Sequence, residues 1–147
     1  MRTVLIFAFF GAALLVATGC ASLDGRAPTG ASDLAGEWRL TDIGGEPLKT
    51  FLPVGERAPT MTIEEDGRLS GFTGVNRMSG QLDPAALAEG RFGLGPMITT
   101  KMAGPGEAMA VEARFLDLLQ KADGANLRGK YLSLTQGGTP TLKFWRE

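Results

Sequence analysis

The sequence predicts a mainly-β domain, a small antiparallel barrel-like sheet with one amphipathic helix packed on it. Two observations lead to this fold class. Short segments in which polar and apolar residues alternate are separated by glycine-rich turns, as in half-buried antiparallel strands. One segment, residues 106–122, has instead the three- and four-residue spacing of apolar side chains that is typical of a helix.

The alternating segments define the expected strands. They are residues 37–41, 60–64, 68–73, 126–128, 131–135 and 141–146. Asp66-Gly67 favours a tight hairpin turn because both residue types tolerate the backbone angles of such turns. Leu132, Leu134 and Phe144 are expected to face the core, and residues 84–90 to form a loop.

The helical segment has an apolar side and a charged side. Ala108, Val111 and Phe115 lie on the apolar side, whereas Glu107 and Glu112 are assigned to the solvent side. Pro105 before the segment and Gly124 after it are typical of helix ends. We expect this helix to cover the sheet.

The N-terminus has the layout of a secretory signal, residues 1–19. A basic residue, Arg2, precedes the apolar run 4–16, and small residues follow it. As a helix, this run reaches only about 20 Å, which is short of the roughly 30 Å of membrane hydrocarbon. We therefore expect the segment to be removed and not to remain as a membrane span.

The single cysteine follows this signal. Ala17-Thr18-Gly19-Cys20 is similar to the lipobox of bacterial lipoproteins, which implies lipidation of Cys20 and a stable membrane tether. Ala21 after it favours, by the same resemblance, the outer membrane and its periplasmic side. The alternative is a plain secretory signal with an incidental cysteine. Residues 20–33, poor in large apolar side chains, are expected to form a flexible tether before a domain at 34–147.

Composition limits the possible functions. The formal net charge is −1 and the sequence has no run of basic residues, so we expect no nucleic-acid partner. Histidine is absent and cysteine occurs once, which removes most routes to a zinc site or a nucleophile–histidine pair. We expect no cofactor, no metal, no catalytic residues and a monomer.

Residues 70–80 hold the densest run of special backbone positions. Gly71, Gly74 and Gly80 interrupt an expected strand and indicate a bulge, a bend or a close approach of backbones. Phe72 and Met78 are expected to lie in the core.

Polar residues accompany this run and have two interpretations, and a third hypothesis concerns carboxylates elsewhere in the chain. In the structural interpretation, Asn76 ties the bend to the loop that carries Thr99, Thr100 and Lys101. In the functional one, these residues and Arg77 form a patch that binds a carboxylate or phosphate. The enzymatic competitor is a carboxylate-based hydrolase, whose candidate residues are Glu64, Glu65, Asp66 and Glu107.

Together, residues 70–80 and 95–103 resemble the signature of the META domain family, and the resemblance covers residues 34–146. It implies a mostly β fold, loosely lipocalin-like, and a relation to the heat-shock lipoprotein of enterobacteria. It also implies links to heat induction and novobiocin resistance without naming a molecular activity. The preferred function is a non-catalytic envelope lipoprotein that supports stress tolerance or envelope integrity through protein contacts. The alternatives are a binder of a small amphiphilic ligand, or an inhibitor or chaperone of an envelope enzyme.

The sequence departs from the family pattern at two positions. Family members often carry cysteines where this chain has Val75 and Gly104. Because both are replaced, the resemblance implies that these two positions are close in space and that relatives can join them by a disulfide.

Overall fold

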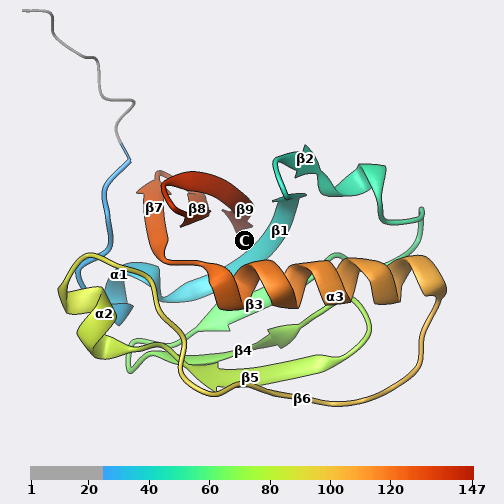
Figure 1. Ribbon diagram of the computed structural model, residues 1–147, viewed down its shortest axis with the longest axis horizontal. Helices are drawn as coiled ribbons and strands as arrows, with labels where there is room; N and C mark the ends of the chain where they lie inside the picture. The colour runs from blue at the N-terminus through green and yellow to red at the C-terminus, as the bar shows by residue number, and fades with distance from the viewer. Residues whose placement is uncertain (1–24) are drawn as a thin grey trace, which may run out of the picture.

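The computed structural model describes residues 25–147, which form nine strands, three α-helices and one 3₁₀ helix (Figure 1). The signal segment, Cys20 and residues 21–24 lie outside the described residues. The strands are β1 (Gly36–Ile43), β2 (Glu46–Pro47), β3 (Thr60–Ile63), β4 (Arg68–Phe72), β5 (Arg77–Gln81), β6 (Ile98–Thr99), β7 (Gly124–Arg128), β8 (Tyr131–Gln136) and β9 (Thr139–Arg146). The helices are α1 (Ala31–Leu34), η1 (Leu48–Thr50), α2 (Pro84–Ala88) and α3 (Gly106–Lys121).

All strands belong to one antiparallel sheet. Its order is β6-β5-β4-β3-β1-β9-β8-β7, and β2 pairs only with β1. Within the described chain the sheet is open, because β6 and β7 are its two ends. The mainly-β prediction with one long helix is confirmed, and each predicted strand and the helix are present close to their expected bounds.

The strand β1 contains a bulge where it pairs with β9. The pairing of β1 with β9 shifts register between Leu40 and Asp42. Trp38, Leu40 and Ile43 are nonetheless all buried, although an undisturbed strand would turn the last of these to the opposite face. The extra residue therefore keeps the apolar side of β1 directed at the core along its whole length.

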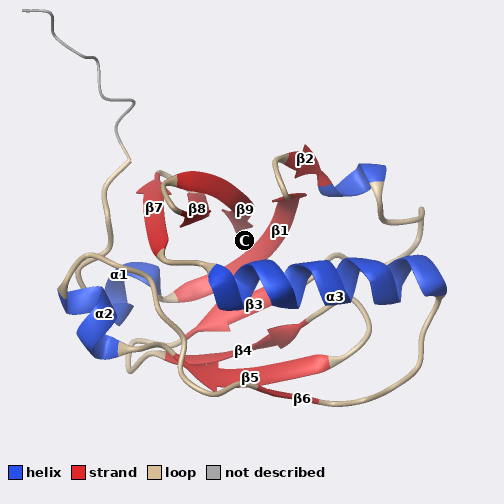
Figure 2. Cartoon of the chain, in the orientation of Figure 1, coloured by secondary structure: helices blue, strands red, loops and turns tan. Residues whose placement is uncertain are grey.

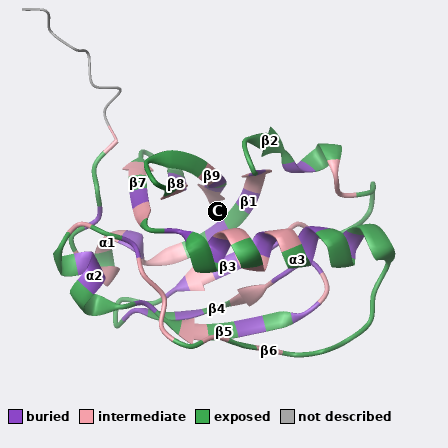
Figure 3. Ribbon diagram, viewed as in Figure 1, coloured by how far each residue is buried: buried purple, intermediate pink, exposed green. Residues whose placement is uncertain are grey.

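The core lies between the sheet and α3, which runs across the sheet in Figure 2. Phe115 of α3 meets Phe144 of β9 edge-to-face with ring centroids 6.3 Å apart, and both side chains are fully buried. Trp38 lies in the same core, where its indole N–H donates to the Leu34 carbonyl at 2.8 Å. Figure 3 shows the buried positions following α3 and the strands that face it.

The sequence predicted one strand with a bend or bulge over residues 70–80. The structure has instead the hairpin β4–turn–β5. Gly74 in the turn has φ +116°, which a side chain would strain. Gly71 is needed for a close approach, because a Cβ there would overlap the Thr60 carbonyl oxygen of β3. Met78 is buried as predicted, whereas Phe72 is only half-buried and lies outside the core.

Two further predictions require correction. Residues 84–90 are not a plain loop, since α2 begins at Pro84, and Asp83 caps it by accepting from the Ala85 N–H at 2.9 Å. The described part of the predicted tether, residues 25–33, is placed against the sheet. Arg26 pairs with Leu127 of β7, and Pro28 is buried. Backbone pairing at a sheet end fixes this segment although it has few apolar side chains.

Val75 and Gly104 are neighbours, as the family resemblance implied. A Cβ built at Gly104 would lie 3.4 Å from the Cβ of Val75 and 2.7 Å from one of its methyl groups. Disulfides join Cβ atoms that are about 3.5–4.5 Å apart, so the pair is close to disulfide geometry. The Val75 methyl groups occupy the space that a Gly104 side chain would need.

We expect the double variant V75C/G104C to form a disulfide on mild oxidation. The cross-link should stabilise the fold by about 2–4 kcal/mol and raise Tm by on the order of 10 °C, because it constrains the unfolded chain. Intact-mass analysis and thermal unfolding, each with and without reductant, measure both effects. Two free thiols after oxidation would contradict the proximity of the two positions.

Candidate functional site

The structure brings four of the five candidate patch residues together at the join between β5 and β6. Asn76 ends the β4–β5 turn, Arg77 begins β5, and Thr99 belongs to β6. The Arg77 N–H donates to Thr100 Oγ1 at 3.0 Å, and Thr99 pairs with Met78. Lys101 follows on the exposed loop.

Asn76 is buried and holds the loop after β6. Its Oδ1 accepts hydrogen bonds from Thr100 Oγ1 at 2.8 Å and from the Met102 N–H at 2.7 Å. Its Nδ2 donates to the Met102 carbonyl at 3.2 Å. With 2% of its surface exposed, the side chain has no room for a ligand, so its contacts support the structural interpretation.

Glu112 of α3 completes this network. Its carboxylate accepts from Thr73 Oγ1, from the Asn76 N–H at 2.9 Å and from Asn76 Nδ2 at 2.8 Å. Thr73, Asn76 and Glu112 are the buried polar residues of the described chain. We call these three residues the Glu112 cluster; it joins the β4–β5 turn, α3 and the loop after β6.

The hydrogen bonds of the Glu112 cluster decide the protonation of its carboxyl group. Burial raises the pKa of Glu112, but the bonds donated by Thr73 and by the Asn76 side chain and backbone lower it by more. The net pKa lies below the ordinary value of 4.5, so the group is ionised at neutral pH. A buried carboxylate with several donors is stable in this position.

Sequence reasoning missed Glu112, which was assigned to the solvent side of the helix. The helical spacing contained the signal, because Glu112 is four residues after Ala108 and three before Phe115, both buried. No sequence pattern predicted the burial of Thr73. It is buried because it lies in the β4–β5 turn, and the glycines of residues 70–80 did not distinguish a turn from a bulge.

The exposed members of the patch lie over a shallow hollow on the outer face of β3–β6. Arg77 and Thr100 line this hollow of about 530 Å³ with Ile98 and Phe72, whereas Lys101 does not. Arg57 stacks on the Phe72 ring, with its guanidinium carbon 4.4 Å from the ring centre. Of the five predicted patch residues, Arg77 and Thr100 therefore belong to this outward-facing surface, whereas Asn76 is buried.

A second hollow of about 760 Å³ continues this surface toward the loop before β3. The two hollows share Arg57, Thr60 and Phe72, and the second also includes the fully exposed Val54. We define the Phe72 surface by its central residues, Val54, Arg57, Phe72, Arg77 and Ile98.

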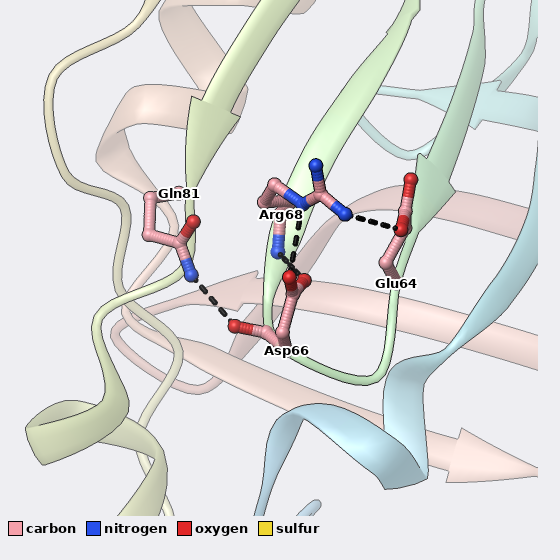
Figure 4. Close-up of polar contacts among 4 residues, drawn as sticks. All are labelled: Glu64, Asp66, Arg68 and Gln81. Carbon is pink, nitrogen blue, oxygen red and sulfur yellow. Dashed lines mark hydrogen bonds and ion pairs between the residues drawn. The ribbon is translucent and has the colours of Figure 1, made fainter.

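The carboxylates considered for a hydrolase do not form one cluster. Figure 4 shows Arg68 between Glu64 and Asp66 in the β3–β4 hairpin, with ion pairs of 3.0 and 2.9 Å, all three side chains being exposed. Gln81 donates to the Asp66 carbonyl at 2.8 Å. Glu107 lines a separate small hollow beside Ile43 and Phe51. These contacts tie the hairpin together, and the hollow that Glu107 lines includes none of the hairpin carboxylates.

The family is decided by a sequence match over residues 32–147, which fit the model of the META domain. The chain belongs to the META domain family. Among curated proteins, none matches the chain significantly.

Solved structures share the fold of this META domain. An NMR structure of a protein from Burkholderia xenovorans aligns over 98% of this chain and 99% of its own, with TM-score 0.63 and 19% identity. A DUF4847 family protein from Bacteroides vulgatus aligns over 77% of this chain and 93% of its own, with TM-score 0.51 and 18% identity. At such identities the similarity concerns the fold alone.

Within residues 25–147 of this META protein, no helix is both long enough and apolar enough to cross a membrane.

We expect E112Q to lower the free energy of unfolding at pH 7 by about 1–3 kcal/mol, because the amide leaves a buried donor of the Glu112 cluster without an acceptor. The folded-state pKa of Glu112 is depressed, so its stabilisation is complete above pH 4.5 and is lost as the pH falls toward the lower folded value. The difference between wild type and E112Q should therefore shrink below pH 4.5.

Urea unfolding across this pH range measures the difference. The matched control is E107Q, which changes an exposed glutamate on the same helix and should stay within about 0.5 kcal/mol of wild type. Equal stability of E112Q and E107Q at pH 7 would contradict the role of the Glu112 cluster.

Proposed function

We propose that this META protein is a non-catalytic envelope lipoprotein, held at the periplasmic side of the outer membrane by lipid on Cys20. It supports envelope integrity under heat or antibiotic stress by binding another envelope protein. The observation that carries the binding proposal is the Phe72 surface, which presents large apolar side chains beside cations that form no ion pair within residues 25–147.

The composition of this surface is that of a protein interface. Val54 is fully exposed, Ile98 is 74% exposed, and Phe72 is half-buried under Arg57. Aromatic and arginine side chains are enriched at the energetic centres of interfaces, and exposed apolar patches mark interaction sites. The strand β6 also ends the sheet here, so its outer backbone groups face no neighbouring strand of the described chain.

The charge of the Phe72 surface favours an acidic partner. Arg57 and Arg77 form no ion pair with any residue of the described chain, and both side chains are exposed. Glu56 is the one carboxylate among the residues that line the two hollows. A partner segment with carboxylates beside apolar side chains would complement this surface.

The structure offers less support for a carrier of a small ligand than for an inhibitor or chaperone of an envelope enzyme. A lipocalin-like carrier needs an interior cavity, but Trp38, Phe115 and Phe144 fill the space between sheet and helix with less than 2% exposure each. An inhibitor or chaperone of an envelope enzyme needs an exposed apolar patch, which the Phe72 surface supplies. This second role uses the same residues and differs only in the identity of the partner.

We expect a photo-reactive amino acid in place of Ile98 to cross-link one dominant envelope protein in living cells. R57E/R77E in the same background should reduce that product about tenfold, because it reverses the charge at the centre of the surface. The same double change should lose the ability of the wild-type gene to restore growth of a deletion strain during heat or novobiocin stress.

The matched control is R91E/K121E, which makes the same charge change at exposed positions away from the Phe72 surface. It breaks the exposed ion pairs with Glu89 and Asp117, whose loss costs little stability, and should behave as wild type. Cross-linking that is equally strong in R57E/R77E, or equally strong with the photo-reactive residue at the exposed Gln136, would contradict binding through this surface.

A further inference from the structure

The described chain begins against one end of the sheet. The Arg26 N–H donates to the Leu127 carbonyl at 3.0 Å, and the Leu127 N–H donates back to the Arg26 carbonyl at 2.9 Å. Figure 1 shows this blue segment running beside β7, on the left of the view, with β2 on the other side of β1. The chain is thus fixed to β7 from Arg26 onward.

If Cys20 carries a lipid, the attachment of the chain to β7 determines which end of the domain lies near the membrane. This step rests on the proposed function. Five residue steps separate Cys20 from Gly25, and an extended chain covers at most about 18 Å in that number of steps. A domain of this size has a radius of gyration of about 14 Å. So short a connection holds the β7 end close to the membrane and keeps the Phe72 surface farther from it.

The side chains at the β7 end are rich in cations. Arg26, Arg128 and Arg146 line a hollow of about 480 Å³ with Asp33. Arg26 and Asp33 form an ion pair at 2.5 Å, and this bond is the largest cause that lowers the pKa of Asp33 to about 2, so their charges cancel near neutral pH. The positive charge of Arg128 and Arg146 remains.

Arg146 adds a buried donor to this hollow. Its Nε is buried and has no hydrogen-bond partner in the described chain. Its guanidinium carbon lies 4.4 Å from the ring centre of Trp38, which holds the group in place. The guanidinium lines the hollow and is held in place, so it adds a fixed positive charge there.

Two aromatic side chains continue the cationic end. Tyr131 of β8 lies opposite Arg128 and Trp145 in the register of the sheet, so the three form one row across β7, β8 and β9. Tyr131 is 55% exposed, and Lys130 Nζ lies 5.0 Å from the ring centre of Trp145. Tyrosine and tryptophan favour the membrane interface because one end of each is apolar and the other polar.

We propose that the β7 end is a membrane-contact face, on which Arg128 and Lys130 bind the phosphates of anionic phospholipids while Tyr131 and Trp145 lie at the headgroup level. Arg146 adds positive charge in the adjoining hollow, which Arg128 also lines. The occupant is the membrane that carries the lipid of Cys20. Charge complementarity and the short connection support the same orientation. The Phe72 surface then faces away from the lipid, where a partner protein can reach it.

Quenching of tryptophan fluorescence by lipids with brominated acyl chains tests this face on the full lipidated protein. The protein is reconstituted in vesicles of phosphatidylethanolamine and phosphatidylglycerol, or of phosphatidylcholine alone. Trp145 is half-buried at the face, whereas Trp38 is in the core and gives the background. We expect strong quenching in the anionic vesicles, its loss in W145F, and much weaker quenching in phosphatidylcholine.

The charge-reversal variant R128E/K130E should lose most of the quenching in anionic vesicles. The matched control K49E/K101E makes the same charge change at exposed positions away from β7 and should retain it. Equal quenching in wild type and R128E/K130E, or in both kinds of vesicle, would overturn headgroup binding. Absence of quenching, with protection of Tyr131 from iodination by polygalacturonate, would assign the face to an acidic glycan instead.

The mass of the protein separates this inference from the proposed function. A lipidated Cys20 without quenching of Trp145 overturns the membrane-contact face alone. An unmodified Cys20 removes the lipid tether and the inference that rests on it.

Discussion

Glu112 accepts hydrogen bonds inside the protein from a turn that is distant from it in sequence, and three segments depend on this contact. The β4–β5 turn reaches the carboxylate through Thr73 and Asn76, and Asn76 in turn holds the loop after β6 through Thr100 and Met102. A buried charge is tolerated only when such donors surround it. The carboxylate of α3 therefore orders the turn, and the donors of the turn fix the position of α3.

This internal role of Asn76 explains the character of the surface above it. Because its side chain faces inward, only Arg77, Thr100 and their neighbours remain for recognition. The two surfaces proposed for recognition are separate: the Phe72 surface lies over β3–β6, and the cationic, aromatic end lies at β7. In the proposed function the Phe72 surface binds a partner protein, and in the further inference the β7 end lies against the membrane.

The sequence was sufficient for the elements with strong periodicity and insufficient where a residue had two possible roles. Alternation identified the long strands, and three- and four-residue spacing identified α3, because burial of one face determines both patterns. The glycines of residues 70–80 were ambiguous, since glycine serves a turn, a bulge and a close approach equally well. Glu112 was misplaced because charge suggests solvent unless its donors are known. The two-residue strands β2 and β6 exist only through their partners, which no local pattern encodes.

The most direct test of the Glu112 cluster is native-state hydrogen exchange of the Met102 amide. Met102 lies on an exposed loop, yet its N–H donates to the buried Oδ1 of Asn76 at 2.7 Å. The cluster predicts that this amide exchanges far more slowly than that of the neighbouring Lys101, since it opens only when Asn76 releases the loop. Exchange of Met102 as fast as that of the exposed Lys101 would contradict the account.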